Sequence, residues 1–124
     1  MAADSRLGGP KRTRLVAAVR ARRQPCPMCS YPIDQTLPRM GRRHPLSSVV
    51  DEWIPRQPCN GRCRRRTCTP VTPGTVDLTN CVETHSVCNG IKSNHWPITS
   101  DLRDQCRTAV EAIIHAPQPT IRPW

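Results

Sequence analysis

The sequence predicts a small α+β domain, built from a β-hairpin and a following helix, with an additional helix near the C-terminus. Cys26-Pro-Met-Cys29 and His85-Ser-Val-Cys88 are the first reason, because each holds two soft ligands separated by two residues. Two short apolar segments lie between these pairs, and an apolar stripe at helical spacing follows them. Since one tight turn can present both ligands of a pair to one ion, we expect a tetrahedral Cys3His zinc site and a zinc-stapled fold.

Size and composition leave little material for a large apolar core. The 124-residue chain has 14 prolines and no phenylalanine, and only 3% of its residues are aromatic. Small scaffolds of this kind commonly depend on disulfides or bound metals. The sequence shows neither a secretory signal nor a membrane-spanning segment, so we expect a cytoplasmic protein with no membrane partner. In a reducing compartment, cysteine pairs favour metal binding over disulfides.

Residues 1–23 are predicted to form a basic, flexible N-terminal arm. Within it, residues 11–23 can form a short helix that places Leu15, Val16 and Val19 on one side. This helix is expected to order on nucleic acid.

Residues 24–96 are predicted to form the core of the domain. Closely spaced prolines forbid a helix around Cys26 and Cys29, which therefore lie in a turn. The expected elements after this turn are a strand over 47–54, a loop over 56–75, a second strand over 77–84 and a short helix over 89–95.

Residues 97–124 are predicted to form a C-terminal helix and a proline-rich tail. Ser100 is expected to cap a helix that begins at Asp101. The apolar residues that recur at helical spacing, and should face the core, are Leu102, Cys106, Val110, Ile113 and Ile114.

A formal net charge of +10, contributed almost entirely by arginine, indicates a polyanionic partner. Arginine suits bidentate contact with phosphate, so nucleic acid is the simplest such partner. The alternative is a solvated surface that only keeps the protein soluble, and the clustering of the charges argues against it. The clustered residues that we expect to bind nucleic acid are Lys11, Arg12, Arg14, Arg62, Arg64, Arg65 and Arg66.

An ordered set of motifs over residues 25–95 resembles the HNH (His-Asn-His) endonuclease family, especially its small phage-type members with a structural zinc. The motifs are Cys26-x2-Cys29, Val50-Asp51-Glu52-Trp53-Ile54-Pro55, Asn80 and His85-x2-Cys88-Asn89-x2-Lys92. The resemblance implies the ββα-metal (His-Me finger) fold and hydrolysis of DNA phosphodiester bonds.

The resemblance also implies a role for each motif residue. Cys26, Cys29, His85 and Cys88 would hold the structural zinc. Asp51 and Asn89 would bind a catalytic cation, and their oxygen ligands suit a hard ion such as Mg²⁺ or Mn²⁺. Asn80 would orient the general base or tie the hairpin together, and Lys92 would contact phosphate or the developing charge.

Glu52 departs from the family pattern, in which a histidine at this position is the general base. Its reference pKa of roughly 4.3, against roughly 6.5 for histidine, makes it the weaker base. Three interpretations stay open: a working base, a second carboxylate on the metal, or a site that has lost activity. Asp51 and Glu52 would point to opposite faces of an ideal strand, so a shared site requires a bulge or strong twist. An ordinary exposed acidic pair is the remaining alternative.

Four further cysteines form a candidate second zinc cluster that would order the arginines beside it. They are Cys59, Cys63, Cys68 and Cys81. Their irregular spacing leaves open a second interpretation, in which they are plain thiols in a loop.

Two functions of different kinds follow from these observations. The first is a divalent-metal-dependent DNA endonuclease, supported by the oxygen ligands. The second is a non-catalytic zinc module that binds nucleic acid, because the zinc ligands and the charge support both functions equally. By analogy with phage proteins that resemble this family, an accessory to a packaging terminase is a further alternative.

Overall fold

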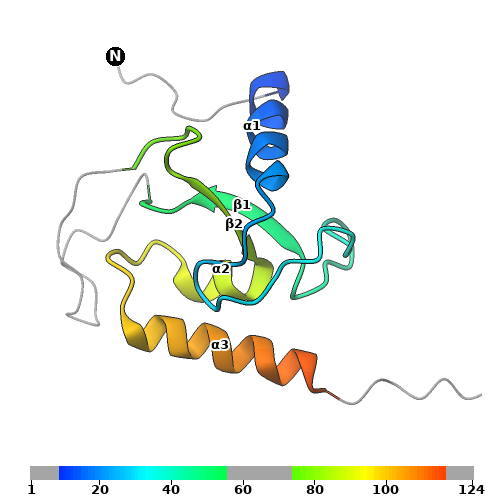
Figure 1. The fold of residues 1–124 in the computed structure, drawn as a ribbon, viewed down its shortest axis with the longest axis vertical. Helices are drawn as coiled ribbons and strands as arrows, with labels where there is room; N and C mark the ends of the chain where they lie inside the picture. The colour runs from blue at the N-terminus through cyan, green and yellow to red at the C-terminus, as the bar shows by residue number, and fades with distance from the viewer. Residues whose placement is uncertain (1–8, 56–73, 117–124) are drawn as a thin grey trace, which may run out of the picture.

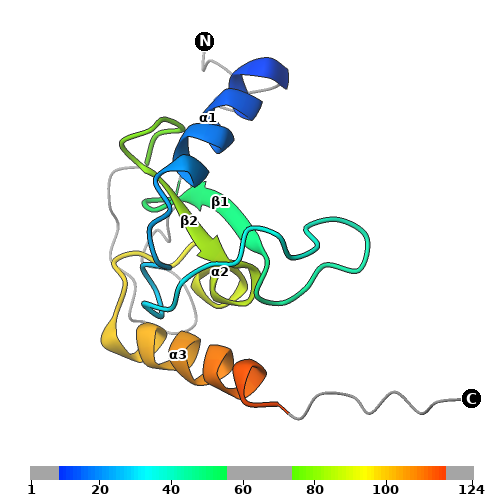
Figure 2. The ribbon, with the colours of Figure 1, turned by 45° about the vertical axis from the view of Figure 1, so that its right-hand side comes forward.

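The computed structural model describes residues 9–55 and 74–116, which form an α+β fold of three helices and one antiparallel hairpin (Figure 1). The elements in chain order are α1 (Gly9–Ala21), β1 (Ser48–Glu52), β2 (Cys81–His85), α2 (Ser86–Lys92) and α3 (Ser100–Ile114). The hairpin lies in the middle, with α1 on one side and α2 followed by α3 on the other (Figures 1 and 2).

The hairpin register assigns its side chains to two faces. Ser48 pairs with His85 at one end and Glu52 pairs with Cys81 at the other. Residues directly opposite each other share a face, so Val50 and Glu83 lie on the same side as Ser48 and Cys81. This side faces α1, because Val50 and Cys81 pack against apolar side chains of that helix.

Helix α1 packs on the hairpin through a small apolar cluster. Leu15 and Val19 are buried and contact Val50 and Cys81. The helix begins at Gly9 and ends at Ala21, two residues earlier at each end than predicted. Residues 9–21 of the predicted arm pack on the hairpin through the apolar stripe of Leu15, Val16 and Val19.

A buried polar network reinforces this docking. Arg20 Nε donates to Ser48 Oγ at 2.8 Å, and Ser48 Oγ donates to Glu83 Oε2 at 2.6 Å. Gln35 Nε2 donates both to the Arg20 carbonyl at 2.8 Å and to Glu83 Oε1 at 3.1 Å. The network satisfies the Glu83 carboxylate, which is only 5% exposed, and joins α1, both strands and the loop before β1.

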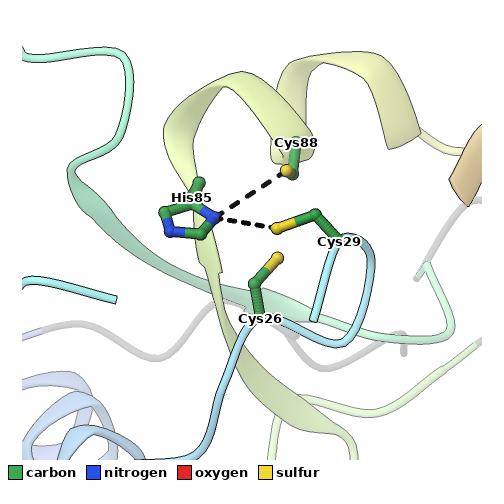
Figure 3. A group of neighbouring side chains, drawn as sticks. All are labelled: Cys26, Cys29, His85 and Cys88. Carbon is green, nitrogen blue, oxygen red and sulfur yellow. Dashed lines mark hydrogen bonds between the residues drawn. The ribbon is translucent and has the colours of Figure 1, made fainter. Parts of the chain in front are cut away.

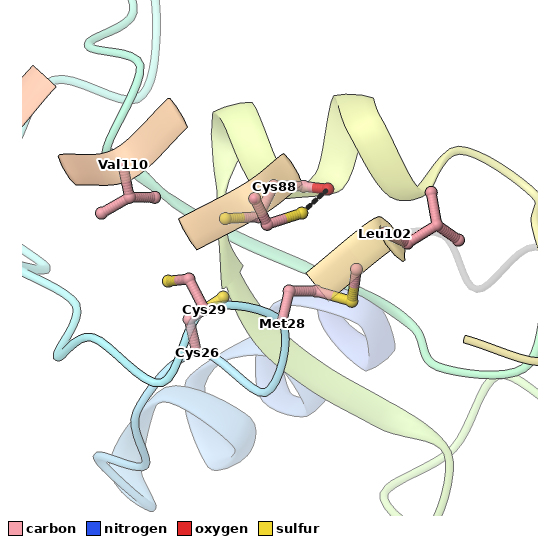
Figure 4. Close-up of a cluster of buried hydrophobic side chains, with 7 residues drawn as sticks. Cys26, Met28, Cys29, Cys88, Leu102 and Val110 are labelled. Carbon is pink, nitrogen blue, oxygen red and sulfur yellow. Dashed lines mark hydrogen bonds between the residues drawn. The ribbon is translucent and has the colours of Figure 1, made fainter. Parts of the chain in front are cut away.

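The main apolar core lies between the first ligand turn, α2 and α3 (Figure 4). Its α3 members are Leu102, Cys106 and Val110, all buried as the helical spacing predicts. Ile114 was expected in this stripe, but it is 45% exposed because it falls in the last turn, beyond the elements that α3 covers. Arg103 Nη1 donates to the Pro27 carbonyl at 2.5 Å and so joins α3 to the ligand turn.

Other predicted boundaries also differ from the structure, including those of the first strand, which runs over Ser48–Glu52 instead of 47–54. The second strand begins at Cys81, because the Asp77 carbonyl accepts hydrogen bonds from the backbone N–H groups of Asn80 and Cys81 and makes a turn there. Helix α2 begins at Ser86 instead of residue 89, so the second ligand pair lies at its start. The cap of α3 is Thr99, whose hydroxyl accepts from the Leu102 N–H at 3.2 Å, and Ser100 is already helical.

None of the helices described for residues 9–55 and 74–116 combines the length and the apolar character needed to cross a membrane. The predicted loop residues 56–73 and the tail residues 117–124 lie outside the described part of the chain. Pro55 and Gly74, the residues on either side of the loop, are joined by a 2.8 Å hydrogen bond from the Gly74 N–H to the Pro55 carbonyl. The chain therefore leaves the hairpin and returns to it at one place.

Removing part of the α1 contact should destabilise the domain. Val19 is 2% exposed, and truncating it to alanine should lower the free energy of unfolding by about 1–3 kcal/mol through lost burial. Urea unfolding of Val19→Ala measures this change, with Ala18→Gln on the exposed side of α1 as the control. Equal effects of the two substitutions would show that α1 is not docked on the hairpin in solution.

Candidate metal centre

Four buried side chains converge where the hairpin meets α2 (Figure 3). The ligand atoms of Cys26, Cys29, His85 and Cys88 all lie within 4.8 Å of one another. His85 Nδ1 is 3.3 Å from Cys29 Sγ and 3.9 Å from Cys88 Sγ. Zinc bonds of about 2.0–2.3 Å at tetrahedral angles place sulfur and nitrogen ligands about 3.6 Å apart. The predicted Cys3His cluster is therefore assembled and could hold a structural metal such as zinc.

Local backbone structure aims each ligand pair at the same point. Cys26 and Cys29 lie in a turn closed by hydrogen bonds from the Ser30 N–H to the Cys26 carbonyl and from the Cys26 N–H to the Tyr31 carbonyl. Ser30 has a φ of 68°, the left-handed conformation that lets the chain reverse directly after the second ligand. His85 is the N-cap residue of α2, which places Cys88 in the first turn of this helix.

The ring of His85 is oriented by a second contact. Its Nε2 lies 3.1 Å from the Pro32 carbonyl, an acceptor that selects the tautomer with a proton on Nε2. The unprotonated Nδ1 then faces the thiols, as a metal ligand requires. A carbonyl behind a coordinating histidine is the usual support for such a ligand, so it adds an observation independent of the sequence spacing.

The protonation of the thiols also suits a cation. Hydrogen bonding from the Cys88 thiol lowers the pKa of Cys26 to about 3, so one thiolate is favoured. Burial raises the pKa of Cys29 to about 11, because a second negative charge in this enclosed place is costly. A divalent cation would offset that cost and allow all three cysteines to bind as thiolates.

The predicted acidic pair lies at the end of β1. Asp51 and Glu52 belong to opposite faces by register, yet their carboxyl groups are close enough for Glu52 to raise the pKa of Asp51. The strand pairing is regular through Glu52, and the backbone bends directly after it, over Trp53 and Ile54. Burial, together with the Glu52 carboxyl, raises the pKa of Asp51 to about 6. Two adjoining, partly buried carboxyl groups are a suitable place for a cation.

Helix α2 supplies the two other predicted site residues. Lys92 is 1% exposed, and its Nζ donates to the Glu52 carbonyl at 3.3 Å. Burial lowers the pKa of Lys92, whereas the charges of Asp51 and Glu52 act to raise it. Asn89 lies one turn earlier on the same helix face, and its side-chain Oδ1 is buried without a hydrogen-bond partner. A buried acceptor in this state costs about 1–3 kcal/mol, and a cation ligated by this oxygen would remove the cost.

Asn80 ties the two sides of the hairpin together. Its Oδ1 accepts from the Ile54 N–H at 2.9 Å, and its Nδ2 donates to the carbonyls of Ile54 and Thr75 at 2.9 and 2.8 Å. Gly74 is required beside it, because a Cβ there would overlap the Ile54 carbonyl and lie 2.5 Å from Asn80 Nδ2. All three side-chain hydrogen bonds of Asn80 go to backbone atoms. Of the two roles that the resemblance implies for Asn80, they fit the one in which it ties the hairpin together.

Sequence reasoning missed the aromatic support of the acidic pair. The rings of Trp53 and Trp96 meet edge to face with their centroids 5.7 Å apart. Lys92 Nζ and the Arg103 guanidinium each lie 5.9 Å from the Trp53 ring centroid, in cation–π contact. Trp53 directly follows Glu52, so this contact holds the bend at the site. Because aromatic residues are scarce in this chain, the tryptophan directly after the acidic pair was the signal that could have indicated this support.

The remaining predicted residues are only partly described. Lys11, Arg12 and Arg14 are exposed on α1. Cys81 is buried in the apolar cluster under α1, at 3% exposure. Its proposed zinc partners and the second arginine cluster lie outside the described residues: Cys59, Cys63, Cys68, Arg62, Arg64, Arg65 and Arg66. The second zinc site stays a prediction.

The Cys3His cluster should bind one zinc ion that the fold needs. Cys29→Ser should lower the zinc content by one ion per chain and remove cooperative thermal unfolding, because the ion joins two distant segments. Elemental analysis and thermal melting measure both effects. Cys106→Ala is the matched control, since Cys106 is also fully buried beside Cys88 but outside the ligand set. Loss of zinc in the control, or its retention in Cys29→Ser, would contradict the assignment.

Comparison with known proteins assigns no family to this chain. No protein-family model, no curated protein and no solved structure matches it. Its function must therefore be inferred from the chemistry of its own side chains.

Proposed function

We propose that this protein is a divalent-metal-dependent endonuclease that hydrolyses phosphodiester bonds in DNA. The observation that carries the proposal is the set of oxygen ligands beside the zinc cluster. The neighbouring carboxyl groups of Asp51 and Glu52 lie at the end of β1, and α2, which contacts this strand, carries the unpartnered buried Oδ1 of Asn89. A zinc module that only binds nucleic acid has no need for such a set.

The catalytic cation would be held by Asp51 and Asn89. Both provide oxygen atoms, which suit Mg²⁺ or Mn²⁺ and differ from the sulfur-rich ligands of the zinc cluster. When bound, such an ion neutralises charge on the scissile phosphate and stabilises the leaving oxygen. The burial that raises the pKa of Asp51 to about 6 would be offset by a positive charge at this point.

Glu52 is the proposed general base. Its carboxyl group touches that of Asp51, so it is within reach of a water molecule bound at the same place. As a base, Glu52 accepts the proton of the water whose oxygen attacks phosphorus. The alternative role, a second carboxylate on the cation, uses the same contact.

Lys92 and Asn80 position the acidic pair in this proposal. The buried ammonium group of Lys92 donates to the Glu52 carbonyl and offsets part of the negative charge of the two carboxyl groups. Asn80 fixes Ile54, two residues after Glu52, through two hydrogen bonds. Contact between Lys92 and a phosphate group stays a prediction, because its side chain is buried in the protein alone.

The alternative function is a non-catalytic zinc module that binds nucleic acid, with a terminase accessory protein as one form of it. The exposed basic residues of α1 favour it, because they can bind phosphate whether or not Glu52 supports catalysis. Phage packaging terminase is the protein partner that this alternative would require.

Removal of either oxygen ligand should abolish cleavage. Plasmid DNA incubated with the zinc-loaded protein and Mg²⁺ or Mn²⁺ should be nicked or linearised, and Asp51→Ala or Asn89→Ala should reduce the rate by about 100-fold or more. Asp104→Ala on the exposed face of α3 is the control. Cleavage that persists in both ligand variants would indicate another site, and binding without any cleavage would favour the zinc module.

Substitution of Glu52 distinguishes its roles. If Glu52 is the base, Glu52→Gln should lose about 100-fold or more in cleavage rate, and Glu52→His should recover much of that loss, because imidazole is the stronger base. Both variants should bind DNA as the wild type does. Activity that survives Glu52→Gln would remove Glu52 from the chemistry. If Glu52→Gln loses activity and Glu52→His does not recover it, the result would favour the role of Glu52 as a second carboxylate on the cation.

A further inference from the structure

A groove on α1 lies apart from both candidate metal sites. It has a volume of about 640 Å³ and is lined by side chains of α1 and by Arg39 of the loop before β1. Arg12, Arg20 and Arg39 supply guanidinium groups, and Thr13 and Val16 lie between them. An anionic ligand is the occupant that this composition fits.

The positive charge around this groove is only partly balanced within the described structure, by the ion pair of Arg20 with Glu83 at 4.0 Å. Helix α1 has four basic residues, Lys11, Arg12, Arg14 and Arg20, and no acidic residue. Within residues 9–55 and 74–116, neither Arg12 nor Arg39 takes part in an ion pair. Arg20 and Arg39 are close enough for the charge of Arg39 to lower the pKa of Arg20, although burial of Arg20 is the larger cause. A bound anion would relieve this repulsion.

We propose that the groove binds the sugar–phosphate backbone of double-stranded DNA. This inference rests on the proposed function and adds the surface that holds the substrate. Helix α1 packs on β1, the strand that carries Asp51, so the groove and the proposed cleavage site belong to the same hairpin.

The length of the basic surface indicates a polymer. Arg12 and Arg20 are eight residues apart, which corresponds to about 12 Å along a helix axis. A single phosphate or a mononucleotide would contact only one of these two arginines. Successive phosphates of one DNA strand would engage both ends.

The lining of the groove favours a duplex over a single strand. Proteins that bind single strands stack the bases on aromatic rings. Among the described residues that line this groove there is no aromatic side chain. Contact through guanidinium groups alone matches a duplex, whose bases are already stacked and whose phosphates face outward.

The opposite side of the molecule has a different charge. Helix α3 has three acidic residues, Asp101, Asp104 and Glu111, against two arginines. Helices α1 and α3 lie on opposite sides of the hairpin and α2 (Figures 1 and 2). This asymmetry would orient the protein with α1 toward a polyanion.

Binding to a fluorescent 20-base-pair DNA duplex tests the proposal. The full-length zinc-loaded protein is used without added divalent cation, so that binding is measured without cleavage, at several salt concentrations. Arg12→Gln combined with Arg39→Gln should weaken binding about tenfold or more, and the slope of log K against log[salt] should become shallower by about 1 for each arginine. Arg20 is left unchanged because it holds Ser48 and Glu83.

Arg107→Gln is the charge-matched control, since Arg107 is half-exposed on α3. It should change the binding much less, and thermal melting should show that all variants are folded. Equal effects of the groove and control substitutions, tighter binding to a single strand or to duplex RNA, or no binding of duplex DNA would each overturn the proposal. Cleavage in the plasmid assay, together with normal DNA binding by the groove variants, would overturn only the groove proposal. Weaker DNA binding by the groove variants, with no cleavage by any variant in the plasmid assay, would overturn only the nuclease proposal.

Discussion

Convergence of Cys26, Cys29, His85 and Cys88 on one point is the constraint on which the other contacts of this domain depend. The cluster joins the turn after α1 to the junction between β2 and α2. Structural zinc in small peptides contributes an apparent binding free energy of about 10–16 kcal/mol, comparable to the whole stability of a typical domain, about 5–15 kcal/mol. A chain with so few aromatic side chains can therefore fold around a metal instead of a large apolar core.

A metal in this cluster would also set the orientation of α2, the helix that carries Asn89 and Lys92. His85 ends β2 and Cys88 lies in the first turn of α2, so the metal would fix the rotation of this helix. Lys92 of this helix then reaches the Glu52 carbonyl at the end of β1. On the other side, Asn80 and Trp53 hold the bend after Glu52. A structural metal would in this way hold α2 and the end of β1 in a fixed arrangement.

The sequence was most informative where spacing has a direct geometric meaning. Ligand pairs separated by two residues predicted the Cys3His cluster, and the helical spacing of Leu102, Cys106 and Val110 predicted the buried face of α3. Contacts between distant segments could not be predicted in the same way. The hydrogen bonds of Asn80 to Ile54, the network of Arg20 and Glu83, and the cation–π contacts of Trp53 all join residues more than 20 positions apart. No local pattern records such pairs, and the start of β2 depended on one turn at Asp77.

The hydrogen bond between Gly74 and Pro55 has a consequence for how such a chain can change over time. The segment between these residues begins and ends at one place, and both ends are fixed by contacts outside it. Each doubling in length of a flexible loop with fixed ends costs only about 0.6 kcal/mol of closure entropy. A change in the number of residues between Pro55 and Gly74 should therefore leave the hairpin, and the metal cluster at its other end, in place.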